Sequence, residues 1–324
     1  MANGVAEELL RLGVEKGDHV LVRVAGREMT KFPLERQDSP TDGLLAELLR
    51  AVGPKGTVLG LAFTPSQRLV RSRGQRGLFT NDSSPTTGKY VESMLKHPDA
   101  VRSEHPTNSF VAIGGMSKAI VSSHTPRSHA FRPVEDLVLL DGKLLLVGCT
   151  HVSPGFSTVH LAQFQLGLSN RTFIAGLALG KYRDVYGGTR SARKWDVPGC
   201  SMGFGRLYPH YRSRRLLREG AVWGAESMLV SAPDALAVER EILSQDPTAV
   251  LCSNPDCFSC RATLLYNRSD WLPYWRRLVA SRLFGDGSQA KRALRGNTPV
   301  PGRSSRYQRE PSNVDLRESV VEQM

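Results

Sequence analysis

The stretch from HVLVRV (His19–Val24) through DGLLAELLRAV (Asp42–Val52) to TVLGLA (Thr57–Ala62) decides the fold. Its outer segments are runs of β-branched and apolar residues bounded by Gly and Asp, which is typical of buried strands. The middle segment carries leucines at helical spacing, and it predicts a helix capped by Thr41 or Asp42. This strand–helix–strand order indicates an α/β sheet.

Later segments extend this pattern. Lys89–Lys96 (KYVESMLK) predicts a second helix, and Ser109–Ile113 (SFVAI) predicts another buried strand. In Leu137–Cys149 (LVLLDGKLLLVGC) two apolar runs flank Asp141-Gly142, a dipeptide that favours the positive φ angles of a type I′ turn. We therefore expect a β-hairpin here, and an α/β fold in which helices flank a mixed central sheet.

The second half of the chain predicts two more helices. One begins at Thr158 and runs to Phe164, directly after the expected hairpin. The other is the amphipathic segment Ala235–Ser244, with Ser231 as its cap and Pro233 in its first turn.

Composition separates the last forty residues from the rest of the chain. From Gly285 the sequence is rich in Gly, Pro, Ser and Arg and almost free of large apolar residues. Such a segment buries too little surface to offset the entropy of ordering it. We expect a single domain over residues 1–284 and a disordered tail over residues 285–324.

Charge and hydropathy limit the cellular context. No apolar run is long enough for a membrane span, and the N-terminus lacks the basic-then-apolar order of a secretory signal. The net charge of +12 comes from basic residues that are spread along the chain, outside any recognisable nucleic-acid-binding module. We expect a soluble, cytoplasmic protein that does not bind nucleic acid.

Polar residues with catalytic potential gather in Gly148–Gln163 (GCTHVSPGFSTVHLAQ). If its end is helical, Ser157, His160 and Gln163 share one face through i, i+3 spacing. An imidazole is a general base near neutral pH, and a hydroxyl can stabilise an oxyanion or act as a nucleophile. The spacing alone leaves the alternative of a capping serine and a partly buried structural histidine open.

The order of several segments resembles the aminoglycoside 3-N-acetyltransferase family, whose fold is distinct from that of GNAT acetyltransferases. The resemblance covers residues from about 5 to about 265 of the chain. It rests on LLRLGVEKGDHVLV, LLAELLRAVGPKGTVLGLAFT, VRSEHPTNSFVAIGG, DLVLLDGKLLLVGCTH, STVHLAQ, WDVPGCSMGFG and GAESMLV. It implies an antibiotic N-acetyltransferase-like fold and a reaction that uses acetyl-CoA.

This resemblance assigns roles to the residues of the catalytic stretch. His160 matches the histidine that deprotonates the acceptor amine, and Ser157 matches a hydroxyl residue that can hydrogen-bond the tetrahedral oxyanion. Gln163 stands where the family usually carries Glu. An amide can orient the ring but stabilises its charged form less, so we expect a weaker base unless Asp196 or Glu226 replaces the carboxylate.

The resemblance also implies a coenzyme A surface. Four residues of the segment 101–115 match the part of the family that lies along the cofactor: Arg102, Ser103, Ser109 and Phe110. A guanidinium and hydroxyls suit a pyrophosphate and a pantetheine arm, whereas an exposed Arg102 could instead pair with Glu104. After the first strand, where the family has His-Ser-Ser, this chain has Arg23-Val24-Ala25, which lacks the two hydroxyls, although Arg23 could supply charge instead.

The acceptor stays open at this point. The leading hypothesis is transfer of an acetyl group to an amine of an aminoglycoside-type antibiotic by direct attack. The alternatives are an acyltransferase of secondary metabolism that uses another amine, and a family member that binds ligand with little turnover.

Five cysteines require a separate interpretation. The odd number, without an export signal, argues against a disulfide framework. Cys252, Cys257 and Cys260, with the distant Cys200, have part of the spacing of a tetrahedral zinc site. Reduced, partly buried thiols explain the same pattern, so we assign no metal ligands and keep these four as candidates for a structural zinc.

Overall fold

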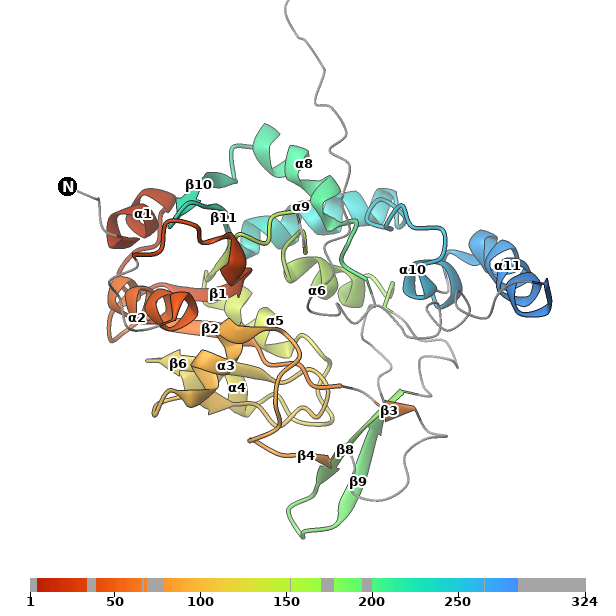
Figure 1. Ribbon diagram of the computed structural model, residues 1–324, viewed down its shortest axis with the longest axis horizontal. Helices are drawn as coiled ribbons and strands as arrows, with labels where there is room; N and C mark the ends of the chain where they lie inside the picture. Colours follow the sequence, from red (N-terminus) through yellow and green to blue (C-terminus); the bar gives the residue numbers. More distant parts are fainter. Residues whose placement is uncertain are drawn as a thin grey trace, which may run out of the picture.

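The computed structural model of the protein describes most of the chain (Figure 1). The described ranges are residues 5–33, 39–65, 67–68, 78–151, 153–169, 178–193, 200–264 and 266–284. The expected tail, residues 285–324, and Asp196 lie outside them. The domain boundary at residue 284 therefore stays a prediction.

Among the described residues, seven strands form a mixed central sheet in the order β10-β11-β7-β1-β2-β6-β5. Its three middle strands are parallel, and the others are antiparallel to their neighbours. In sheet order the strands are β10 (Arg218–Val222), β11 (Ala225–Ser231), β7 (Lys143–Val147), β1 (His19–Val24), β2 (Thr57–Leu61), β6 (Phe110–Gly114) and β5 (Val101–Arg102). The predicted α/β fold with a mixed sheet is confirmed.

The apolar run of β1 explains why this strand occupies the centre. Val20, Leu21 and Val22 are all buried, and Val20 pairs with Val58 of β2 on one side and Lys143 of β7 on the other. Because successive side chains point to opposite faces, Leu21 joins one hydrophobic cluster, and Val20 and Val22 join another. A strand covered on both faces needs this continuous apolar sequence.

Helices cover both faces of the sheet. The cluster that contains Val20 also takes in residues of α1 (Val5–Leu12), α2 (Pro40–Val52) and α3 (Lys89–Lys96). The cluster on the other face includes residues of helices that follow β6 in the sequence. These are α4 (Ser117–Ser122), α5 (Arg132–Leu139), α6 (Thr158–Gln165), α8 (Tyr208–Ser213) and α9 (Ala232–Gln245).

The helix starts test the predicted caps. Ser231 accepts from the backbone N–H of Asp234 at the start of α9, as predicted. The cap predicted for α2 is wrong: Ser39 accepts from the N–H of Asp42, and the helix begins at Pro40. A proline fits the first helical position because its missing N–H would have no partner there, which moves the cap one residue before it.

The hairpin predicted over residues 137–149 is also wrong. Its first half lies in α5, and only its second half is a strand, β7. Pro133 stands in the first turn of α5, and Val134 and Leu137 bury one face at helical spacing. Asp141 does adopt a positive φ of 50°, but Gly142 does not, so the predicted type I′ turn is absent and the dipeptide joins a helix to a strand.

A second, four-stranded sheet of described residues was not predicted. It comprises β3 (Gln67–Arg68), β4 (Leu78–Phe79), β8 (Ala178–Arg183) and β9 (Thr189–Arg193), and Figure 1 shows it beside the central sheet. Gly180 of β8 lies against the loop between β5 and β6, where a Cβ would come within 2.7 Å of Thr107 Cγ2. This close approach places the small sheet next to that loop.

The described chain ends in three helical segments. They are α10 (Phe258–Ala262), the 3₁₀ turn η4 (Arg268–Asp270) and α11 (Trp271–Phe284). Figure 1 shows α10 and α11 at one end of the molecule, beyond α6 and α9. None of the helices in the described ranges is long and apolar enough for a membrane span.

Candidate active site

The carboxyl ends of the three parallel strands meet at one edge of the central sheet. The loop between β5 and β6 reaches the same edge, because β6 runs antiparallel to β2. The segment after β7, residues 148–157, also begins there and leads into α6. In α/β sheets ligands bind at this edge, so we expect the catalytic residues to lie there.

Hydrogen bonds from two distant side chains fix the segment between β7 and α6. Arg23, at the end of β1, donates to the carbonyl oxygens of Gly155 at 2.7 Å and Ser153 at 2.9 Å. The hydroxyl of Tyr208 accepts from the N–H of Gly155 at 2.7 Å and donates to the carbonyl of Thr150 at 2.9 Å. Burial raises the pKa of Tyr208 to about 12, so the phenol keeps its proton.

Gly155 allows this segment to pack closely. Its φ is +80°, and a Cβ there would overlap the Cβ atom of Phe204. Only glycine combines this backbone conformation with such contact. Phe204 in turn places its ring 4.7 Å from the ring of His160.

His160 lies in α6, half-buried, with its ring held on two sides. Phe131 lies 4.6 Å away between ring centroids, and Phe204 packs edge-on. Nδ1 is 3.2 Å from Oε1 of the buried Gln163, one turn later. Because an amide oxygen accepts, Nδ1 carries the proton and Nε2 of the neutral ring keeps its lone pair. The predicted i, i+3 pairing of His160 and Gln163 is present.

Ser157 stands at the cap position of α6 but does not cap it. Its side chain accepts no hydrogen bond from the first helical N–H groups, and it is 4% exposed. Its carbonyl oxygen accepts from the N–H of His160 at 3.2 Å. The hydroxyl is therefore one turn from the imidazole and is not used by the helix start.

Glu239 of α9, which was not predicted from the sequence, holds the start of α6 through a hydrogen bond. Its Oε1 accepts from the hydroxyls of Thr158 and Tyr211, each at 2.7 Å. Burial raises the pKa of this carboxyl to about 8. The sequence does contain an indication of this role, because Glu239 is spaced i, i+4 from the apolar Ala235 and Leu243 and therefore lies on the same helix face. All three are buried in the structure.

Arg102 is engaged by protein groups. Its guanidinium donates to the carbonyls of Ala62 and Asn81, at 2.9 and 2.8 Å, and to the hydroxyl of Ser109 at 3.1 Å. It also lies over the ring of Phe79. Burial lowers its pKa to about 10, with Asp82 opposing the shift. These contacts differ from the ion pair with Glu104 that the sequence left open.

The other predicted cofactor residues of this segment lie in the interior. Ser103 Oγ is 2.9 Å from Nδ1 of His124 and accepts from the N–H of Phe110. Ser109 donates to the carbonyl of Ala62 at 2.6 Å. Ser103, Ser109 and Phe110 are at most 1% exposed. They shape the sheet edge, and direct contact with a cofactor stays a prediction, as it does for Arg102 and Arg23.

Of the two acids considered as a replacement for the missing carboxylate, only Glu226 is described. Its Oε2 lies 3.3 Å from Nε2 of the exposed His151. Its backbone carbonyl accepts from the N–H of Gly148. Glu226 thus helps to hold the start of the segment that leads to α6.

The four candidate zinc ligands are brought together. The Sγ atoms of Cys200, Cys252, Cys257 and Cys260 all lie within 4.8 Å of one another. The fifth cysteine, Cys149, is buried at the sheet edge, and its thiol donates to the carbonyl of Arg23.

Known proteins share both sequence and fold with this chain. The family model for aminoglycoside 3-N-acetyltransferase matches residues 29–244. The aminoglycoside N(3)-acetyltransferase III proteins of a Salmonella species and of Enterobacter cloacae are each 28% identical over 186 residues, covering 52% of this chain. The match spans 62% of the length of these relatives.

Two solved structures extend the similarity over more of the chain. AAC(3)-IVa, as a histidine-to-alanine mutant in complex with a gentamicin, is 26% identical with a TM-score of 0.64 and covers 80% of this chain and 94% of its own. AAC-IIIb, a binary complex with CoASH, is 22% identical with a TM-score of 0.64, covers 74% and 95%, and supports the fold. The matched family model spans most of the chain, which therefore belongs to the aminoglycoside 3-N-acetyltransferase family.

Proposed function

We propose that this protein is an N-acetyltransferase that moves the acetyl group of acetyl-CoA to an amine of an aminoglycoside-type antibiotic. Family membership and the solved structure of a relative with a gentamicin support this substrate class. The observation that carries the proposal is His160, whose ring is held by two aromatic side chains and whose Nδ1 faces Gln163. In the tautomer that this contact favours, Nε2 carries the lone pair that acts as the base.

The reaction proceeds by direct attack. Nε2 of His160 takes a proton from the acceptor amine as its nitrogen attacks the thioester carbonyl carbon. A C–N bond forms, the C–S bond breaks, and the proton passes to the leaving thiolate to give free coenzyme A. No covalent acyl-enzyme is needed, because both substrates meet in one complex.

Ser157 supplies a hydroxyl for the tetrahedral oxyanion. It stands at the first turn of α6, where backbone N–H groups and the positive end of the helix dipole also favour negative charge. Such a donor contributes most when it is fixed before the charge develops. The hydrogen bonds of Arg23 and Tyr208 to the backbone of Thr150, Ser153 and Gly155 supply that rigidity.

Gln163 sets the strength of the base. Its amide oxygen orients the ring, but it has no negative charge to stabilise the imidazolium that forms during the reaction. We infer slower proton transfer than a carboxylate at this position would support. This substitution and the net charge of +12 favour a second candidate, acyl transfer to a less cationic amine of secondary metabolism. They also motivate a binding-only alternative.

Coenzyme A would lie along the same sheet edge. Arg102 and Arg23 supply positive charge there, and the buried Ser103, Ser109 and Phe110 shape the wall behind it. Because acetyl-CoA is an intracellular metabolite, the proposal places the protein in the cytoplasm. The acyl transfer as written uses no metal, so an ion at the four cysteines would be structural.

Release of free thiol from acetyl-CoA, measured over a panel of amines, tests the proposal. The panel contains gentamicin- and kanamycin-class compounds and non-aminoglycoside amines, each with and without the protein. Acceptor-dependent release with aminoglycosides supports the leading candidate. Release only with other amines supports the second candidate. Binding of acetyl-CoA without release for any acceptor overturns catalysis.

A further inference from the structure

We propose that Cys200, Cys252, Cys257 and Cys260 bind one zinc ion. Their sulfur atoms lie within 4.8 Å of one another. In a tetrahedral site with Zn–S bonds of about 2.3 Å, the sulfurs are separated by roughly 3.8 Å. The thiols therefore occupy nearly the positions that a zinc ion requires, and small side-chain rotations complete the geometry.

The backbone near the ligands forms a compact frame. Cys257 stands at the cap position of α10, Cys260 lies inside that helix, and Cys252 precedes the turn that leads to it. The N–H of Cys257 donates to the carbonyl of Asn254 at 3.2 Å and closes this turn. Three ligands thus come from one turn-and-helix unit, and Cys200 reaches them from a separate part of the chain.

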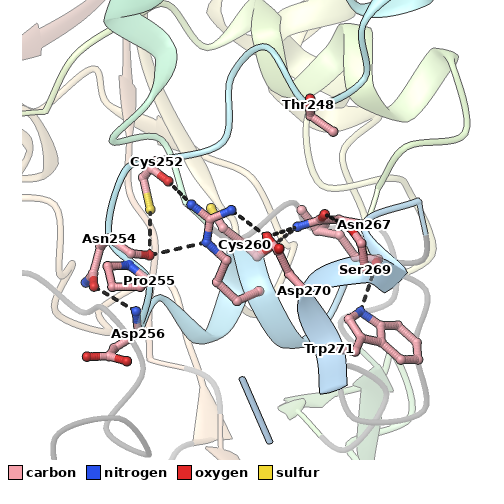
Figure 2. Close-up of polar contacts among 12 residues, drawn as sticks. Thr248, Cys252, Asn254, Pro255, Asp256, Cys260, Asn267, Ser269, Asp270 and Trp271 are labelled. Atoms are coloured by element: carbon pink, nitrogen blue, oxygen red, sulfur yellow. Dashed lines mark hydrogen bonds and ion pairs between the residues drawn. The ribbon is translucent and has the colours of Figure 1, made fainter. Parts of the chain in front are cut away.

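Arg261 and its neighbours hold this frame rigid (Figure 2). The guanidinium donates to the carbonyl of Cys252 and, at 2.6 Å, to the carboxylate of Asp270. Asn267 donates to the carbonyl of Cys260 at 2.8 Å and to the same carboxylate at 2.9 Å. These bonds fix the residues beside the ligands through backbone carbonyls, and Cys252 Sγ makes one long contact, 4.0 Å, with the carbonyl of Asn254. The guanidinium also places positive charge beside a site whose four thiolates and Zn²⁺ would sum to −2.

The hydrophobic support of this frame is small. Around the thiols the buried apolar cluster contains only Leu251, Leu264 and three of the cysteines among the described residues, with Cys200 and Tyr266 at the margin. A second small cluster joins Ala262 of α10 to Tyr274 and Leu278 of α11. A unit of this size buries too little apolar surface to be stable alone, and proteins commonly stabilise such units with a metal or disulfides. The four clustered cysteines are free thiols in the structure, which fits a metal rather than disulfides.

A zinc ion here would cross-link two segments that reach the catalytic helix. Cys200 is four residues before Phe204, whose ring contacts His160. The backbone of Gly203 packs directly on the carbonyl of Val250. On the other side, the Tyr266 side chain packs against the cysteine cluster and lies close to the Gln163 side chain. The metal would therefore fix both neighbours of His160 without touching a reacting atom.

The direct test is the metal content of the full-length protein purified with reductant and without added metal. Elemental analysis is expected to give about one zinc per chain. Replacing zinc by Co²⁺ is expected to give the visible d–d bands of a tetrahedral site and sulfur-to-cobalt charge transfer of four thiolates. These readouts do not depend on acyl transfer, so they can succeed or fail independently of the proposed function.

Single variants then identify the ligands. Cys252→Ser and Cys257→Ser are each expected to lower zinc to less than about one tenth of an equivalent. Cys149→Ser is the matched control, because Cys149 is an equally buried thiol outside the cluster, and it should keep full zinc. Less than about one tenth of an equivalent in the wild type, a disulfide among the four cysteines, or iron in place of zinc overturns the proposal. If the variants fail to fold, the wild-type metal content and cobalt spectrum decide.

Discussion

The central sheet and the cysteine frame of residues 251–270 are stabilised in different ways. The sheet lies between two large apolar clusters, one on each face, that draw residues from most of the chain. The frame has a small apolar cluster and a dense set of side-chain-to-backbone hydrogen bonds around Arg261 and Asn267. The sheet can therefore carry a polar site at its edge at little cost, whereas the frame depends on a few specific links.

This difference predicts where substitutions act. At the sheet edge, polar substitutions should change the reaction and leave the fold intact, because burial elsewhere dominates stability. In the frame, loss of one link should release the whole unit, because little else holds it.

His160→Ala should lower the rate of acyl transfer by roughly 10²–10⁴-fold, the usual contribution of a general base. The control is His151→Ala, which changes the exposed histidine of the same segment and should leave the rate near that of the wild type. His160→Ala should also lower the thermal midpoint modestly, because this imidazole packs against Phe131 and Phe204, whereas the exposed His151 should leave the midpoint unchanged. If both variants have equal rates, His160 is not the base.

Removal of zinc should open the frame before the sheet. Zinc in about a thousandfold excess over its Kd stabilises the state that binds it by about 4 kcal/mol. After chelation, hydrogen exchange should accelerate in α10 and α11, while the amides of β1 stay protected. Exchange that accelerates equally in both regions would show that they unfold as one unit, and unchanged exchange would show that the metal does not hold the frame.

Glu239 should make stability depend on pH. Burial raises its pKa from the ordinary 4.5 to about 8. Between these values the folded state binds the proton and the unfolded state has lost it, so stability falls as pH rises, by at most about 1.4 kcal/mol per pH unit. Above about pH 8 this contribution stops changing.

Glu239→Gln should remove that slope, because the amide keeps an acceptor for Thr158 and Tyr211 but does not titrate. Glu241→Gln is the control, since Glu241 lies on the exposed side of the same helix and pairs with Arg214. Urea unfolding at several pH values measures both variants. If the pH dependence of stability persists in Glu239→Gln, another titratable group causes it.

Sequence predicted those parts of the molecule that depend on local pattern. The apolar runs of β1, β2 and β6 and the helical spacing in α2, α3 and α9 identify these elements. The segment Leu137–Leu140 was assigned to the wrong class, because four apolar residues fit a buried strand as well as a helix end. The strands of the small sheet escaped notice because β3 and β4 have two residues each and β9 is mostly exposed.

The same distinction between local pattern and tertiary contact holds for the residues of the candidate site. His160 and Gln163 could be paired because they are three residues apart, and the family resemblance added their roles. Tyr208 and Phe204 could not be found, because they reach the site only through tertiary contacts. Cysteine spacing alone could not separate zinc ligands from reduced thiols; the structure adds that Cys200 joins the other three.

Gln163 links the two regions, because it lies at the sheet edge and also beside Tyr266 of the frame. Gln163→Glu should give His160 a negative partner that stabilises the imidazolium, and raise the rate up to about tenfold. The acid limb of the pH–rate profile should move to higher pH, because the imidazole then keeps its proton longer. Burying a carboxylate should also lower stability modestly.

Gln163→Leu is the matched variant, since it removes the acceptor for Nδ1 and keeps similar bulk. It should lower the rate and leave the limb of the profile nearly unmoved, because no charge has been added. Opposite changes in rate from the two variants would show that Gln163 acts through the imidazole. If both variants instead lowered the rate in proportion to a loss of zinc, the side chain would act mainly as a support for the cysteine frame, and the two regions would be less independent than their cores indicate.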